Sequence, residues 1–141
     1  MKWFDKLQIN IRKGDIFKSG TDGLMITATT SLSPYGNLSK EFFEKHGQIL
    51  MLQIDSILNS RTNKSLQLGE AVSVAIEESQ DKTKRVILAA LWQNENPYTP
   101  NLIYSVYINS LRNAFKSNLS SLSLPILKVP KHILSEKVVQ F

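Results

Sequence analysis

The stretch that decides the fold is Asp22-Gly23-Leu24-Met25-Ile26-Thr27-Ala28-Thr29, followed by a loop at Ser31-Leu32-Ser33-Pro34-Tyr35-Gly36-Asn37 and a helix that opens at Leu38. Its apolar centre, Leu24-Met25-Ile26, does not alternate with polar residues, which predicts a strand covered on both faces. The first turn of the following helix offers unpaired backbone N–H groups and a partial positive charge. A buried strand that delivers a loop containing Gly and Asn to such a helix start predicts an anion site.

The segments around this stretch predict further strands. Period-two alternation over residues 7–12 predicts a half-buried strand that ends at Gly14-Asp15. Strands are predicted at residues 70–77 and 85–92, and the short charged connection between them indicates an antiparallel hairpin. With a last short strand at residues 122–126, the sheet should be mixed rather than wholly parallel, and helices should lie on both of its sides.

Helical spacing predicts two short helices after the loop. The first has Asn37 as its N-cap and Gly47 as its C-terminal breaker, and the second covers residues 50–58. Thr99 as N-cap and Pro100 at the first helical position predict a longer helix that ends around Ser117-Asn118. A final helical pattern at residues 134–139 follows the segment 128–131. The sequence therefore predicts an α/β architecture.

Composition narrows the possible functions. The 141 residues predict a single domain over 1–141, and no apolar run approaches the roughly 20 residues of a membrane span or the core of a signal peptide, so a cytoplasmic location and no membrane partner are expected. The absence of Cys and the two scattered His residues predict no metal site and no cofactor. No catalytic grouping is found. The net charge of +5 is dispersed, which indicates affinity for phosphate rather than nucleic acid, or simply a solvated basic surface.

In their order and spacing these motifs resemble the macro domain, an ADP-ribose-binding module. The resemblance covers nearly the whole chain and is carried by Gly14-Asp15-Ile16, Asp22 to Thr29, Pro34 to Leu38, Gly69-Glu70-Ala71, Val86 to Trp92 and Leu124-Pro125-Ile126-Leu127. It implies a three-layer α/β/α fold with a central mixed sheet, of bacterial type. The family's final strand has no counterpart before the chain stops at Phe141.

The resemblance also implies a set of ligand-binding residues. These are Asp15, Ile16, Thr27, Thr29, Pro34, Tyr35, Gly36, Asn37, Leu38, Lys128 and Val129. By this resemblance, Asp15 accepts the exocyclic amine of adenine, because a carboxylate offers acceptors only. The backbone of 34–38 surrounds the diphosphate, and Thr29 lies near the distal ribose. By the same resemblance, Lys128 and Val129 belong to a second phosphate loop, in which the side chain of Lys128 or Lys131 replaces the family's glycine amides; the alternative is that both lysines are solvated.

Two departures from the family pattern bear on function. Ile26 and Thr29 stand where the family has two Asn residues, and Tyr35 and Asn37 flank a single glycine. These departures favour binding of ADP-ribose, a related adenine nucleotide or an ADP-ribosylated protein over catalysis. Two alternatives stay open: an ADP-ribosyl hydrolase or O-acetyl-ADP-ribose deacetylase, and a sensor or interaction domain that has lost this ligand. The sequence does not set the oligomeric state.

Overall fold

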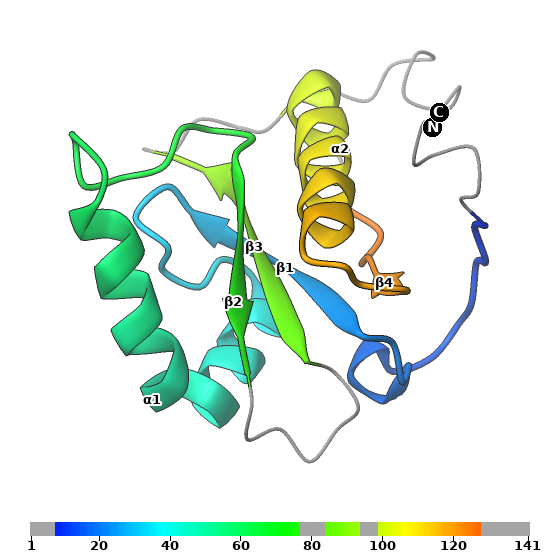
Figure 1. The fold of residues 1–141 in the computed structure, drawn as a ribbon. Helices are drawn as coiled ribbons and strands as arrows, with labels where there is room; N and C mark the ends of the chain where they lie inside the picture. Colours follow the sequence, from blue (N-terminus) through cyan, green and yellow to red (C-terminus); the bar gives the residue numbers. More distant parts are fainter. Residues whose placement is uncertain (1–7, 77–83, 94–98, 128–141) are drawn as a thin grey trace.

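A computed structural model describes residues 8–76, 84–93 and 99–127 of the chain (Figure 1). The described elements follow in the order η2 (Ile16–Lys18), β1 (Gly23–Thr29), α1 (Asn37–Asn59), β2 (Ala71–Ala75), β3 (Arg85–Trp92), α2 (Pro100–Lys116) and β4 (Leu122–Ser123). Neither of the two α-helices in these ranges is both long and apolar enough to cross a bilayer.

The four strands form one mixed sheet in the order β2-β3-β1-β4. The strand β1 lies at the centre, parallel to both β3 and β4, while β2 runs antiparallel to β3. The predicted mixed sheet and the predicted hairpin of β2 and β3 are therefore confirmed. The strand predicted at 70–77 is shorter, because β2 starts at Ala71 and ends at Ala75, and β3 has the predicted bounds 85–92.

Helices cover both faces of this sheet, with α1 on one side and α2 on the other (Figure 1). Successive residues of a strand face opposite sides. Leu24 and Ile26 of β1 accordingly pack in the core on the α1 face, and Met25 packs in the core on the α2 face. All three side chains are at most 2% exposed, which explains why the strand is apolar without alternation. The α/β prediction with helices on both faces is confirmed.

The predicted first strand is wrong over the described residues 8–12. No strand forms there, and the side chains of Ile9 and Ile11 are 76% and 87% exposed. Alternation defines an apolar face, but a strand also needs a neighbour that accepts its hydrogen bonds, and no described segment pairs with this one. The chain then turns into the 3-10 helix η2 instead of ending a strand, with Asp15 as its N-cap.

The segment after the loop forms two helical stretches that meet at a kink and together make up α1, so the prediction of two helices is confirmed. Its N-cap is Gly36, at φ +94°, not Asn37, which lies inside the first turn. Glycine suits this position because its φ is left-handed. The break between the two stretches lies at His46, at φ −124° and ψ 15°, one residue before the predicted breaker Gly47. The second stretch then continues to Asn59.

The C-terminal half follows the sequence more closely. Thr99 caps α2 by accepting a hydrogen bond from the N–H of Leu102 at 3.2 Å, and Pro100 opens the helix, as predicted. The last strand is shorter than predicted. It stops at Ser123 because the next residues turn to α2, where the Tyr107 hydroxyl donates to the carbonyl of Pro125 and accepts from the N–H of Leu127. The helix predicted at 134–139 lies outside the described residues.

Candidate functional site

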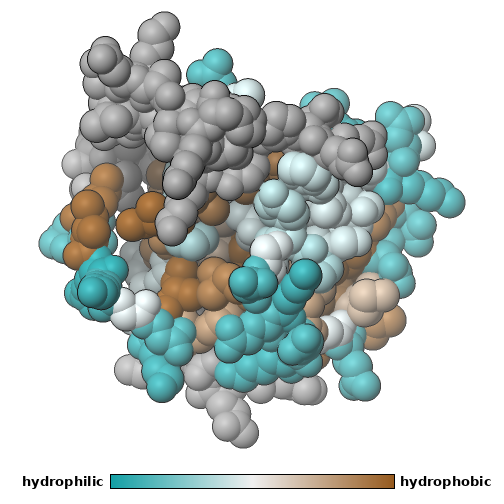
Figure 2. Space-filling model, turned by 180° about the vertical axis from the view of Figure 1, so that it is seen from behind, coloured by the Kyte–Doolittle hydropathy of each residue, from teal (hydrophilic) through white to brown (hydrophobic). Residues whose placement is uncertain are grey.

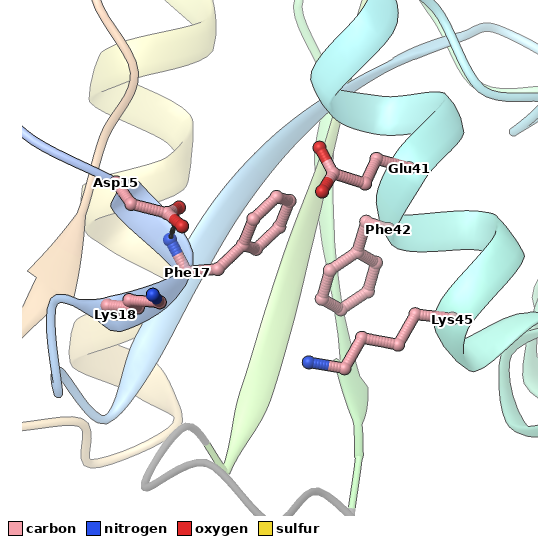
Figure 3. Close-up of a pocket in the computed structure, with 6 residues that line it drawn as sticks. All are labelled: Asp15, Phe17, Lys18, Glu41, Phe42 and Lys45. Atoms are coloured by element: carbon pink, nitrogen blue, oxygen red, sulfur yellow. Dashed lines mark hydrogen bonds between the residues drawn. The ribbon is translucent and has the colours of Figure 1, made fainter.

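A cavity of about 170 Å³ lies between η2 and the N-terminal half of α1 (Figure 3). Its two walls come from segments more than 20 residues apart in the chain. The residues that line it are Asp15, Phe17, Lys18, Glu41, Phe42 and Lys45. One predicted ligand-binding residue, Asp15, therefore lies beside a cavity.

Asp15 has its orientation fixed by its own turn. Its Oδ1 accepts a hydrogen bond from the N–H of Phe17 at 3.0 Å, and its carbonyl accepts one from the N–H of Lys18 at 3.0 Å. The side chain is exposed, and among the described residues nothing hydrogen-bonds to Oδ2. The carboxylate can thus accept a further hydrogen bond from a donor in the cavity.

Between the charged groups the cavity has an aromatic wall. The rings of Phe17 and Phe42 are stacked, with centroids 6.0 Å apart and planes 18° apart, and the centroid of the His46 ring lies 4.6 Å from that of Phe42. Figure 3 shows the carboxylates of Asp15 and Glu41 toward one end of the cavity and the ammonium groups of Lys18 and Lys45 toward the other. A flat group with a donor at one edge and an acceptor at the next fits this arrangement.

The N terminus of α1 lies close to the acidic end of this cavity. Glu41 follows Asn37 by four residues, which is about 6 Å along the helix axis. The cap residue, Gly36, is exposed and supplies no side chain, so the first backbone N–H groups of α1 have no side-chain cap. Those groups and the helix dipole favour an anion at this point.

The loop before α1 is held tightly against the sheet. Tyr35 stacks on Trp92, with centroids 5.1 Å and planes 11° apart, and its carbonyl accepts a hydrogen bond from the Thr27 hydroxyl at 2.8 Å. Pro34 forms an isolated bridge with Ala28. Tyr35 thus packs toward the core on the α2 face and does not fill the Asp15 cavity.

Thr29 also takes part in holding this loop. Its hydroxyl accepts from the N–H of Ser33 at 3.1 Å and lies 3.0 Å from the Ser31 hydroxyl, while its own N–H donates to the carbonyl of Ser33 at 2.9 Å. The side chain is half-buried at the end of β1. Its hydrogen bonds therefore fix the shape of the loop.

The predicted site residues fall into two groups on opposite faces of the sheet. Ile16 and Leu38 pack on the α1 face, beside the Asp15 cavity. Thr27 shares the α2 face with Met25 by alternation, whereas Thr29 follows an irregularity in the register between β1 and β3. Residues 34–37 run from one face to the other. Lys128 and Val129 lie outside the described residues, so their role stays a prediction.

Sequence reasoning missed five of the six residues around the cavity. Phe17 and Lys18 follow Asp15 closely, and the spacing of Glu41 and Lys45 puts both on one helix face next to Phe42. This spacing was a usable signal, but nothing local indicates that η2 packs on that face. In the described ranges, no group of three or more His, Cys, Asp or Glu side chains could hold a metal ion.

Solved macrodomain structures superpose on this chain. The macrodomain of Mycobacterium tuberculosis DarG matches with a TM-score of 0.72 and 17% identity, over 94% of this chain and 85% of that one. The Oceanobacillus iheyensis macrodomain with ADP gives 0.64 and 23%, over 79% and 60%. The Trypanosoma brucei macrodomain in complex with ADP-ribose gives 0.57 and 18%, over 74% and 40%. The chain thus spans less than two thirds of the last two.

At these identities the likeness shows the fold alone, which is that of a macrodomain. No protein-family model matches the sequence, and no curated protein matches it.

Proposed function

From the macrodomain fold of this chain, we propose that it binds ADP-ribose or a related adenine nucleotide, free or attached to a protein. The base enters the cavity beside Asp15, and the diphosphate lies at the N terminus of α1. Two of the similar structures are named as complexes with ADP and with ADP-ribose, which supports this ligand class.

The observation that carries the proposal is the position of Asp15. Its carboxylate lines an aromatic cavity that begins about one helical turn from an N terminus without a side-chain cap. At about 170 Å³ the cavity is smaller than the roughly 300 Å³ at which sites for whole small molecules begin. It therefore holds one flat group, the base, and the remainder of the ligand lies outside it.

The charges around the cavity suit this placement. Asp15 and Glu41 accept from an exocyclic amine, and Lys18 or Lys45 donates to a ring nitrogen beside it. The two acids and two lysines leave the cavity without net charge, which favours a neutral base over a phosphate. The phosphates then occupy the N terminus of α1, where helix dipole and backbone N–H groups attract an anion.

We propose that the protein binds its ligand and does not hydrolyse it, and the hydrogen bonds of Thr29 support this proposal. A hydrolase must hold a water molecule in a defined position, and small misplacements cost heavily. The Thr29 hydroxyl already accepts from Ser33 and contacts Ser31. These contacts hold the hydroxyl in the loop, which supports a structural role for Thr29 over a catalytic one.

Calorimetric titration with ADP-ribose, ADP, AMP and NAD tests the proposal. Asp15→Asn keeps an oxygen that can accept from the Phe17 N–H but removes the charge and one acceptor. We expect it to weaken ADP binding roughly ten- to hundredfold, as for the loss of a hydrogen bond to a charged group, about 1.5–3 kcal/mol. Asp55→Asn, at an exposed position of α1 away from the cavity, is the matched control.

Inosine diphosphate sharpens the test, because a carbonyl replaces the amine that Asp15 accepts from. Wild type should prefer ADP to IDP, and Asp15→Asn should remove that preference. No measurable heat with any adenine nucleotide would disprove the function. Binding that is equally strong in wild type and Asp15→Asn would disprove the role of Asp15 while leaving the function standing.

A further inference from the structure

A second cavity, of about 400 Å³, forms a groove between α2 and the residues that lead into β2. The proposed nucleotide site makes no use of it. Its lining comes from one continuous segment and from one face of α2. The residues are Gln67, Leu68, Gly69, Glu70, Ala71, Ser105, Asn109, Arg112, Asn113 and Lys116. This list defines what we call the α2 groove.

The floor of the α2 groove consists of fixed amide groups. The Nδ2 of Asn109 donates to the carbonyl of Gly69 at 2.7 Å, and the Nδ2 of Asn113 donates to the carbonyl of Ala71 at 2.9 Å. With both NH₂ groups turned to the backbone, the two Oδ1 atoms remain as acceptors. Because β2 is an edge strand, this floor runs along the side of the sheet. The groove therefore offers fixed acceptors to a donor-bearing chain.

The rim of the α2 groove is positively charged. Arg112 and Lys116 are exposed and lie one helical turn apart on α2. Glu70, the acidic side chain among the described residues of the lining, forms an ion pair with Arg61. Its charge is thus compensated, and the rim attracts carboxylates.

The α2 groove starts near the end of the sheet at which Thr29 lies. The N–H of Leu66 donates to the carbonyl of Thr30 at 2.8 Å, and the N–H of Gly69 donates to the carbonyl of Ala90 at 2.8 Å. Residues of β2 and β1 face each other across β3, about 10 Å apart at two strand spacings. The resemblance to the macro domain puts the distal ribose near Thr29, so a chain attached to that ribose leaves the site at the end of the sheet where the groove starts.

We propose that the α2 groove binds an acidic polypeptide segment of a protein that carries ADP-ribose, which rests on the function proposed above. The N–H groups of the segment donate to the Oδ1 atoms of Asn109 and Asn113, and its carboxylates pair with Arg112 and Lys116. A nucleic acid fits less well, because its phosphate oxygens would face the acceptor oxygens of the floor. The nucleotide then supplies the common part of the ligand, and the groove selects the protein.

Three ligands separate the groove from the nucleotide site. They are free ADP-ribose, a peptide with one ADP-ribosylated serine flanked by Glu residues, and the same peptide with Gln in place of Glu. Wild type should bind the Glu peptide about tenfold more tightly than free ADP-ribose, or about 1.4 kcal/mol. Arg112→Gln/Lys116→Gln should remove that gain and leave the affinity for free ADP-ribose unchanged. Arg12→Gln/Lys64→Gln changes the net charge equally outside the groove and should keep the gain.

The unmodified Glu peptide, titrated at high concentration, tests the groove without the nucleotide. Binding that disappears in the Arg112→Gln/Lys116→Gln variant supports the groove even if ADP-ribose itself is not bound. Equal affinities for the Glu peptide, the Gln peptide and free ADP-ribose overturn the inference and leave the proposed function intact. The inference is also overturned if an ADP-ribosylated oligonucleotide, and not the Glu peptide, binds more tightly than free ADP-ribose and loses this advantage in the Arg112→Gln/Lys116→Gln variant.

Discussion

The two helices hold the same sheet in different ways. The polar contacts of α1 to the sheet lie far apart: Ser39 donates to the carbonyl of Thr27, and Gln53 bonds to both backbone groups of Ala75. The kink and the Asp15 cavity lie between them. On α2, Asn109 and Asn113 contact the backbone from successive turns of an unbroken helix. Space for a small ligand is thus left under α1, while α2 offers a fixed polar surface.

Figure 2 shows the molecule from behind, where brown, apolar surface lies between teal, polar patches. On the α1 face the core uses large side chains, including Phe42, Leu50 and Ile54. On the α2 face it includes the small residues Ala71, Ala89 and Ala114. Small residues let a helix approach the sheet closely, but Ala28 and Ala90 lie on the α1 face as well, so both cores combine large and small side chains.

The largest expected effect tests how much the aromatic side chains on the α1 face contribute to the stability of the fold. Phe42 is 3% exposed and contacts both Phe17 and His46. Phe42→Ala should lower the free energy of unfolding by about 3–5 kcal/mol, because it enlarges an existing cavity. Urea denaturation measures this change. Phe115→Ala, at a side chain 55% exposed on α2, should cost less than about 1 kcal/mol. Similar costs for the two variants would contradict the comparison.

On the α2 face the corresponding test is Tyr107→Phe. Its hydroxyl donates to the carbonyl of Pro125 and accepts from the N–H of Leu127. The change leaves both backbone groups unpaired and should lower the free energy of unfolding by about 1–3 kcal/mol. Thermal and urea unfolding near pH 8 measure this loss. A variant as stable as wild type would show that the hydroxyl does not hold this segment.

The same residue predicts a pH dependence. Burial raises the pKa of Tyr107 above its ordinary 10.0, although the hydrogen bond from Leu127 acts in the opposite direction. Because the folded-state pKa lies above the unfolded one, the contribution of Tyr107 to stability is complete below pH 10 and falls as pH rises through the folded pKa. Wild type should therefore lose more unfolding free energy than Tyr107→Phe between pH 9 and about 11. Parallel pH profiles would contradict this.

A smaller effect is expected where α1 covers the sheet edge. The side chain of Gln53 donates to the carbonyl of Ala75 at 2.7 Å and accepts from its N–H at 3.1 Å. Gln53→Ala should lower the free energy of unfolding by about 1 kcal/mol, since water can replace the lost bonds at an edge strand. On α2, Asn113→Ala removes the hydrogen bond to the carbonyl of Ala71 and should lower the free energy of unfolding by a similar amount. If either variant lowers the free energy of unfolding by more than about 3 kcal/mol, water cannot reach the backbone of β2 to replace the lost hydrogen bonds.

The smallest effect belongs to Ser110 on α2. Its side chain is 0% exposed, and its Oγ has no hydrogen-bond partner among the described atoms. Ser110→Ala removes an unpaired polar group and should leave the free energy of unfolding unchanged or raise it by up to about 1 kcal/mol. Urea denaturation of the variant beside wild type decides. A loss of more than 1 kcal/mol would show that Oγ has a partner.

The elements that the sequence predicted are those with local signals. The apolar run Leu24-Met25-Ile26 carries the central strand, and Thr99-Pro100 carries the start of α2. The strand at 7–12 was wrong because alternation does not reveal whether a neighbouring strand exists. The cap at Asn37 was wrong because the preceding glycine adopts a positive φ. The positive φ of Gly36 can be recognised only once the path of the loop is known.

The candidate site shows the same limit. The resemblance to the macro domain singled out Asp15, and the structure puts that residue beside a cavity. Phe17, Glu41 and Lys45 carry no motif and come together only when η2 packs on α1. The α2 groove likewise needs the pairing of β2 with β3 before Gly69 and Asn109 become neighbours.

The kink at His46 divides α1 into two mechanical parts. The part after it carries Leu50 and Ile54, which are buried, and Gln53, which is tied to Ala75. The part before it carries the exposed Glu41 and Lys45. This first part is anchored as well, because the Ser39 hydroxyl donates to the carbonyl of Thr27 and the side chain of Phe42 is buried. Substitutions at Glu41 and Lys45 can therefore change the size and charge of the space opposite η2, while the anchors on both sides of the kink stay in place.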